Sequence, residues 1–165
     1  MQLLSLLLFA SVTIASDEPT QTLRGKPLAC ELDVPASWRV ISDQDGARIT
    51  AIGDGAGLML GETAENLGDP SAAAKVGRDM ATKQDPNATV TEPVPITVAG
   101  HKWLQFTNNS PGLEGDPTTF LVYSYTGVEG TFIIIGFAPT DLFERKKVLL
   151  TRYMSTFRFP KPVAR

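Results

Sequence analysis

Chemically versatile side chains are scarce in this chain. Its 165 residues include one cysteine, Cys30, and one histidine, His101. A single cysteine excludes any disulfide within the chain, so packing must stabilise the fold. A histidine-based metal site needs further ligands at defined spacing, and none accompanies His101. We therefore expect neither a metal nor a cofactor.

Basic residues are also few and scattered. Lysine and arginine total 15 against 18 acidic residues, which gives a net charge of −3. Nucleic-acid binding needs a basic patch or stripe, so the composition excludes nucleic acid as a partner. The chain has no internal repeat and no low-complexity tract, and its length favours one domain.

The N-terminal segment differs from the rest. Residues 1–16 are mostly apolar and uncharged, and they end in the small residues Ala15 and Ser16 before Asp17. This pattern is typical of a secretory signal peptide, although no lysine or arginine precedes the apolar run. The run is too short for a membrane span. We expect an exported protein, periplasmic or secreted, with no membrane span after signal removal. The alternative is a buried N-terminal helix or strand.

The remaining residues predict a single α+β domain. Residues 17–27 are polar and indicate an extended leader, and 160–165 form a proline-containing tail. Between them, alternating apolar residues predict strands, and apolar residues at helical spacing predict two helices. The expected strands are 28–34, 47–52, 57–63, 88–91, 95–98, 101–107, 120–125 and 132–137, and the expected helices lie between 69 and 85 and over 142–153.

Several local patterns refine these expectations. Asp69 can cap the first helix, and Pro70 suits its first position. Asp141, three residues before Glu144, resembles a capping box at the start of the second helix. Residues 132–137 read Phe-Ile-Ile-Ile-Gly-Phe, apolar on both faces, which predicts a central strand covered on both sides.

This order of elements resembles the PsbP-like superfamily. The resemblance rests on Val34-Pro35 with Trp38, on Gly100 with Trp103, and on the Phe-x-Phe ending at residues 157–159. The superfamily includes the photosystem subunit PsbP, a nuclear Ran-binding family and DcrB-like exported bacterial proteins. The resemblance implies an antiparallel β-sheet sandwiched between helices, an α/β/α sandwich, over residues 28–159. It also implies a non-enzymatic binding or assembly protein.

Other short patterns give weaker indications. Cys30 alternates with Leu32 and Val34, so we expect it inside the core as a small apolar residue. Residues 43–46 imitate the start of a calcium loop, but Asp54 occupies the twelfth position, where glutamate is needed. Residues 53–57 are rich in glycine without the lysine of a phosphate loop, and predict a hairpin. Two triplets, starting at Asn87 and Asn108, match the glycosylation acceptor pattern.

The longest expected loop, residues 108–117, is the sequence's best candidate for a binding surface. Long loops on rigid sheets often mediate recognition. The loop offers amide and carboxylate groups and one apolar anchor, and it can equally be a tolerated surface insertion. The candidate partner-binding residues are Asn108, Asn109, Leu113, Glu114 and Asp116.

Three functions remain open at this point. The first is an exported, non-enzymatic protein that acts through contacts with an unidentified protein partner. The second is an envelope immunity or inhibitor protein that neutralises a toxin, such as a secretion-system effector. The third is a metal-dependent carrier or an enzyme, for which His101 would be the histidine available.

The third function gives a direct test. Because no set of metal ligands is visible in the sequence, the protein should bind neither Ca²⁺ nor Zn²⁺ stoichiometrically. Native mass spectrometry with each ion added measures this, with a chelator-treated sample as the control. A mass increase of one bound ion per chain would contradict the expectation.

Overall fold

A computed structural model describes residues 18–25, 30–43, 48–63, 68–111 and 116–159. The signal peptide expected at residues 1–16 and the tail expected at 160–165 lie outside the described residues. The elements, in chain order, are β1 (Thr20–Gly25), β2 (Cys30–Pro35), β3 (Arg39–Ser42), β4 (Arg48–Gly53), β5 (Ala56–Thr63), α1 (Pro70–Gln84), β6 (Thr89–Val90), β7 (Val94–Val98), β8 (His101–Ser110), β9 (Thr118–Gly127), β10 (Gly130–Pro139) and α2 (Thr140–Met154).

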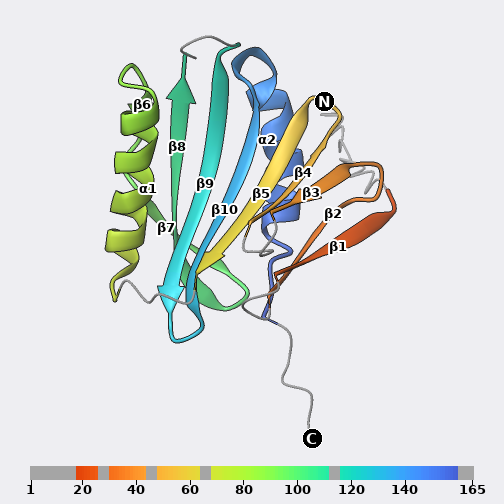
Figure 1. Cartoon of the computed structure of the whole chain (residues 1–165), viewed down its shortest axis with the longest axis horizontal. Helices are drawn as coiled ribbons and strands as arrows, with labels where there is room; N and C mark the ends of the chain where they lie inside the picture. Colours follow the sequence, from red (N-terminus) through yellow and green to blue (C-terminus); the bar gives the residue numbers. More distant parts are fainter. Residues whose placement is uncertain (1–17, 26–29, 44–47, 64–67, 112–115, 160–165) are drawn as a thin grey trace, which may run out of the picture.

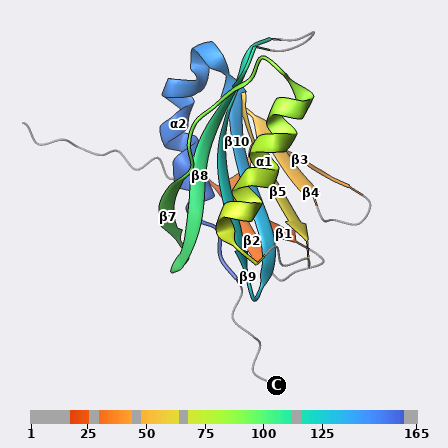
Figure 2. The same ribbon diagram turned by 90° about the vertical axis from the view of Figure 1, so that its left-hand side faces the viewer.

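The chain forms an antiparallel sheet with a helix on each face. The strand order is β3-β4-β5-β10-β9-β8-β6, with β7 also paired to β8, and all of these pairs are antiparallel. A separate hairpin of β1 and β2 lies beside α2 (Figure 1). The two helices lie on opposite sides of the sheet (Figure 2). This is the expected α+β architecture, an antiparallel sheet between helices.

The larger core lies between the sheet, α2 and the β1–β2 hairpin. Leu150 and Met154 of α2 are fully buried there, and Gly136 of β10 lets both side chains approach the strand closely. Aromatic rings fill the end of this core near the chain terminus, where Trp103 and Phe157 have ring centroids 4.9 Å apart. Edge-to-face contacts of this kind add to the energy of apolar burial.

The core on the other face is much smaller. Its buried members are Ala74 of α1, Phe106 of β8 and Val122 of β9. Helix α1 contacts β8 and β9 and does not extend over β10, β5 or β4 (Figure 1). Among the described residues, half of this face is therefore left without a covering helix.

The start of α1 follows the sequence pattern, and the start of α2 does not. The Asp69 carboxylate accepts a hydrogen bond from the backbone N–H of Ser71 at 2.8 Å, and Pro70 is the first helical residue. Helix α2 begins earlier than expected, because its N-cap is Pro139, which makes no side-chain cap hydrogen bond. The capping box expected at Asp141 is therefore wrong, and Asp141 lies in the first turn.

Two expectations about the strands need correction. The strand at 132–137 is central, within β10, but it is not covered on both sides, because Ile133, Ile135 and Phe137 remain partly exposed. The loop expected at 108–117 is shorter, because Asn108–Ser110 complete β8 and pair with β9. Asn108 and Asn109 also pair with β6. Backbone pairing on both sides overrides the turn-like composition of these residues.

The glycine-rich segment after β4 forms a turn, and the polar segment before β2 forms a strand. Asp54 and Gly55 both have positive φ angles, 51° and 66°, as the tight hairpin between β4 and β5 requires. The expected leader at 17–27 contains β1, which pairs with β2 from Thr20 to Gly25. That segment is thus an integral part of the core on the α2 side.

The two faces of α2 provide a matched test of this core. Leu150 is 0% exposed and Val148 is 78% exposed. Leu150→Ala should lower the free energy of unfolding by about 2–5 kcal/mol, because it leaves a cavity. Val148→Ala should change it by less than about 0.5 kcal/mol. Urea denaturation followed by tryptophan fluorescence measures both, and equal effects would contradict the packing described here.

Candidate functional site

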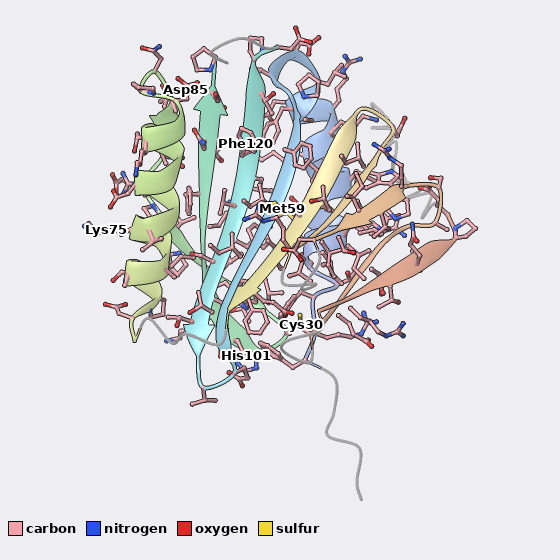
Figure 3. All side chains as sticks on the ribbon, viewed as in Figure 1. Cys30, Met59, Lys75, Asp85, His101 and Phe120 are labelled. Carbon is pink, nitrogen blue, oxygen red and sulfur yellow. The ribbon has the colours of Figure 1, made fainter. Side chains whose placement is uncertain are left out.

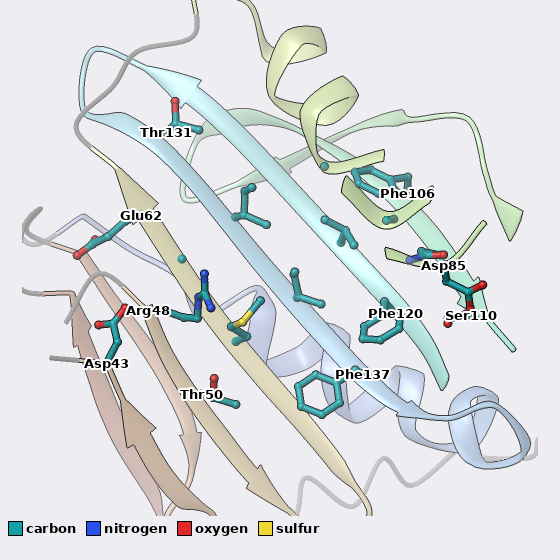
Figure 4. A pocket seen from close by; sticks show the side chains of 18 residues that line it. Asp43, Arg48, Thr50, Glu62, Asp85, Phe106, Ser110, Phe120, Thr131 and Phe137 are labelled. Atoms are coloured by element: carbon teal, nitrogen blue, oxygen red, sulfur yellow. Dashed lines mark hydrogen bonds between the residues drawn. The ribbon is translucent and has the colours of Figure 1, made fainter. Parts of the chain in front are cut away.

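The uncovered half of the sheet contains a groove of about 610 Å³ beside α1 (Figure 4). This volume is within the range typical of ligand pockets. Among the described residues, the lining is largely apolar in the middle and polar at both ends. The lining residues used below are Arg48, Met59, Gly61, Gly77, Ala81, Asp85, Asn108, Ile133, Ile135 and Phe137.

Strand register places the floor residues in rows. Residues directly opposite one another in an antiparallel sheet point to the same face. One row runs from β4 to β8 through Arg48, Gly61, Ile133, Ser124 and Leu104. The next rows are Thr50, Met59, Ile135, Val122 and Phe106, and then Gly57, Phe137, Phe120 and Asn108. The rows cross five strands, with apolar side chains on β5, β10 and β9 in the middle and polar side chains on β4 and at Asn108 toward the two ends.

One glycine in β5, Gly61, produces the hollow. Gly57 and Gly61 both belong to the groove face, so β5 contributes only Met59 as a side chain between them. The ring of Phe137 occupies the space over Gly57, where an added Cβ would come within 2.2 Å of it. At Gly61 the nearest heavy atom to such a Cβ is 3.9 Å away. Gly61 therefore leaves open space that a side chain would fill.

Polar groups gather at the end of the groove beneath the C-terminal end of α1. Asp85, the C-cap of α1, accepts hydrogen bonds from the backbone N–H of Asn87 at 3.0 Å and from the Ser110 hydroxyl. Asn108 is only 8% exposed, and its Oδ1 atom has no hydrogen-bond partner among the described residues. A buried acceptor without a donor is energetically costly, so this atom can receive a donor from a bound molecule.

The opposite end of the groove has a cation. Figure 4 shows Arg48 and Asp85 on opposite sides of the apolar floor. None of the ion pairs among the described residues includes Arg48. Asp43 and the buried Glu62 also line this end, and Glu62 accepts a hydrogen bond from the Cys30 thiol at 2.8 Å.

The residues expected to bind a partner are only partly brought to this site. Asn108 lines the groove, whereas Asn109 points to the other face, where its Oδ1 accepts a hydrogen bond from the Thr119 hydroxyl at 2.8 Å. Asp116 is exposed beyond the groove. Leu113 and Glu114 lie outside the described residues.

His101 is far from the groove. Figure 3 shows Asp85 and His101 at opposite ends of the sheet. The His101 ring packs against Tyr125 and Phe159, and its Nδ1 atom lies 3.4 Å from the Tyr125 hydroxyl. Burial, followed by a hydrogen bond to Glu129, raises the pKa of Tyr125 to about 12. These contacts place His101 in an aromatic cluster at the edge of the core.

Metal-ligating side chains do not converge in the described part of the chain. No cluster of three or more histidine, cysteine, aspartate or glutamate residues there could hold a metal ion. Residues 44–46 of the calcium-like segment lie outside the described residues, and Asp43 is exposed. No helix within the described ranges is long and apolar enough to cross a bilayer. The groove, as described, is equipped for binding.

Most residues of this site carry no local pattern that would identify them from the sequence. The apolar row of β10 was visible in the sequence, but apolarity on both faces of a strand indicates burial without saying what covers it. The spacing Gly57-x-Met59-x-Gly61 was a further indication, since alternate glycines leave one face of a strand without side chains. The position of Asn108 under α1 depends on long-range pairing and could not be predicted locally.

The arrangement of one helix on each face of an antiparallel sheet defines a PsbP-like fold, as the sequence indicated. Solved structures with this fold include the cyanobacterial PsbP of Synechocystis, which is 18% identical with a TM-score of 0.60. That match covers 94% of this chain and 99% of the other. The Ran-binding protein Mog1p of Saccharomyces cerevisiae is 7% identical with a TM-score of 0.60, over 86% and 96% of the two chains.

A third structure is a protein of unknown function from Pseudomonas aeruginosa, PA94. It is 17% identical with a TM-score of 0.51, over 87% of this chain and 99% of the other. No protein-family model and no curated protein matches the chain. At these identities the likeness shows the fold alone.

The reactivity of the Cys30 thiol tests the environment beside Glu62, at the Arg48 end of the groove. The thiol is 1% exposed, as the core placement predicted. Burial raises the pKa of Cys30, and the neighbouring Glu62 carboxylate raises it further. Each pKa unit lowers the thiolate fraction about tenfold, so alkylation by iodoacetamide at pH 8 should be at least about tenfold slower in the folded protein than in urea. Equal rates would contradict this environment.

Proposed function

We propose that the chain is an exported, non-enzymatic binding protein that receives part of a protein partner in the groove. The observation that carries this proposal is the uncovered apolar half of the sheet, with the buried Oδ1 atom of Asn108 at its end. Exposed contiguous apolar surface with a polar rim is typical of interaction sites. The apolar composition of residues 1–16 supports export.

The energetics of the groove favour binding over a merely structural role. Ile133, Ile135 and Phe137 are partly exposed on one face of a central strand, where burial by a partner would remove apolar area from water. Asn108 would gain a hydrogen bond at the same time. Both gains are available only when another molecule occupies the groove.

Asp116, and Asn109 on the opposite face of β8, lie near the same end of the sheet and are proposed to contact parts of the partner that extend beyond the groove. Both are exposed, and they are joined to the groove end through β8 and the start of β9. Leu113 and Glu114, from the sequence prediction, are proposed as further contacts in this region.

A photoreactive residue in the groove tests the proposed function. Benzoylphenylalanine in place of Ile135 should cross-link a partner protein from the envelope fraction of the cells that produce the chain. The same residue in place of Val148, on the exposed side of α2, is the matched control. Because Gly61→Leu fills the hollow, it should reduce the cross-link at position 135 by about tenfold.

The contrary results are equally clear. Identical cross-linked products from positions 135 and 148 would show that the groove has no special role. An intact cross-link in the Gly61→Leu variant would show the same. Circular dichroism of each variant confirms that the fold is kept, which the open space at Gly61 leads us to expect.

A further inference from the structure

The uncovered strip has the width of one helix. It consists of β4, β5 and β10, and three strands at about 4.8 Å spacing span about 14 Å. One side of the strip is bounded by α1, which contacts β8 and β9. An α-helix with its side chains is about 10 Å across, so a second helix fits beside α1 on this face.

The wall formed by α1 allows such a helix to approach closely. Gly77 and Ala81 are the helical residues that line the groove most directly, and they lie one turn apart on the same side of α1. Interaxial distance between packed helices depends on the size of the side chains at the contact. Gly77 lies against the ring of Phe106, where an added Cβ would come within 3.2 Å, so α1 itself sits close to the sheet here. Together with the small side chain of Ala81, this close packing lets side chains of a neighbouring helix reach both α1 and the sheet.

The backbone of the occupant gives the strongest argument for a helix. A segment lying extended across the floor would place its N–H and C=O groups against Met59, Ile133 and Ile135, which offer no hydrogen bonds. A helix satisfies these groups internally and presents only side chains to the floor. An amphipathic helix laid into an apolar groove is a recurrent recognition mode.

Two polar groups indicate what the ends of that helix should be. The buried Oδ1 atom of Asn108 needs a hydrogen-bond donor, such as a lysine, arginine or amide side chain. Arg48 is four strands away and two rows further along the strands, about 23 Å from Asn108 in the plane of the sheet. It forms no ion pair among the described residues, so it can pair with a carboxylate of the partner. A donor toward one end and an acidic residue toward the other would match the groove.

We propose that the groove is the docking site for an amphipathic helix of the partner protein. The helix lies on β4, β5 and β10 next to α1, with a donor at Asn108 and a carboxylate at Arg48. About ten residues, or 15 Å of helix, cover the three rows of the floor, and long side chains at the two ends of the helix span the remaining distance to Asn108 and Arg48. This inference rests on the proposed function and specifies the partner's contact element.

Peptide selection on the full chain tests the inference. A phage-displayed library of random 14-residue peptides is selected on the protein and depleted on its Gly61→Leu variant. The retained peptides should have apolar residues at i, i+3, i+4 and i+7 and should gain helical circular dichroism when they bind. Their affinity for the Gly61→Leu variant should be at least about tenfold weaker.

A charge exchange then tests the placement of the helix. Arg48→Glu should weaken a selected acidic peptide about three- to tenfold, and changing the peptide's glutamate to lysine should restore binding. Arg145→Glu is the matched control, because it makes the same charge change on an exposed residue of α2, on the opposite side of the sheet. It should leave the affinity unchanged.

Failure of this inference is distinguishable from failure of the proposed function. Groove-dependent peptides that alternate in polarity and stay non-helical would overturn the helix, while cross-linking at position 135 could still support a protein partner. A selection that yields no groove-dependent peptide would also overturn it. So would a cross-link from position 135 to a lipid, to a second copy of the chain or to its own residues 1–16.

Discussion

The structure depends on how much of a wide sheet two helices can cover. Neighbouring strands lie about 4.8 Å apart and a helix is about 10 Å across, so one helix covers about two strands. The main sheet has eight strands. On the α2 side, the β1–β2 hairpin supplies additional cover and the core is large. On the other side, among the described residues, α1 is the only element that covers the sheet. It covers too few strands, and the groove lies over those that remain.

The hairpin and α2 also fix the rigidity of the groove floor. The residues that alternate with the floor residues along each strand are packed in the larger core. In β10, for example, Phe132 and Ile134 are both 0% exposed. Because the floor side chains alternate with these buried residues, they cannot turn away from the groove without breaking the larger core. The groove floor is therefore pre-formed, which would limit the entropy lost if a partner docked there as proposed.

The sequence was sufficient to predict the fold class because its periodicities are local. The alternation in β2, the Asp69-Pro70 start of α1 and the Asp54-Gly55 turn each depend on neighbouring residues, and all three are present in the structure. The N-cap of α2 was misassigned because Pro139 extends β10 directly into the helix. The sequence pointed to residues 108–117 as the candidate site, because consecutive asparagines are typical of loops. In the structure, Asn108 and Asn109 belong to a strand instead, because their backbones pair with β6 and β9.

The open space at Gly61 separates two requirements that usually coincide at a glycine. Its backbone has no positive φ, and an added Cβ would meet nothing closer than 3.9 Å. Folding therefore tolerates other residues at this position, while an open groove does not. Among homologous chains that diverge freely elsewhere, the side chain at this position would act as a record of selection: glycine would persist where the groove is used, and larger residues would accumulate where that use has been lost.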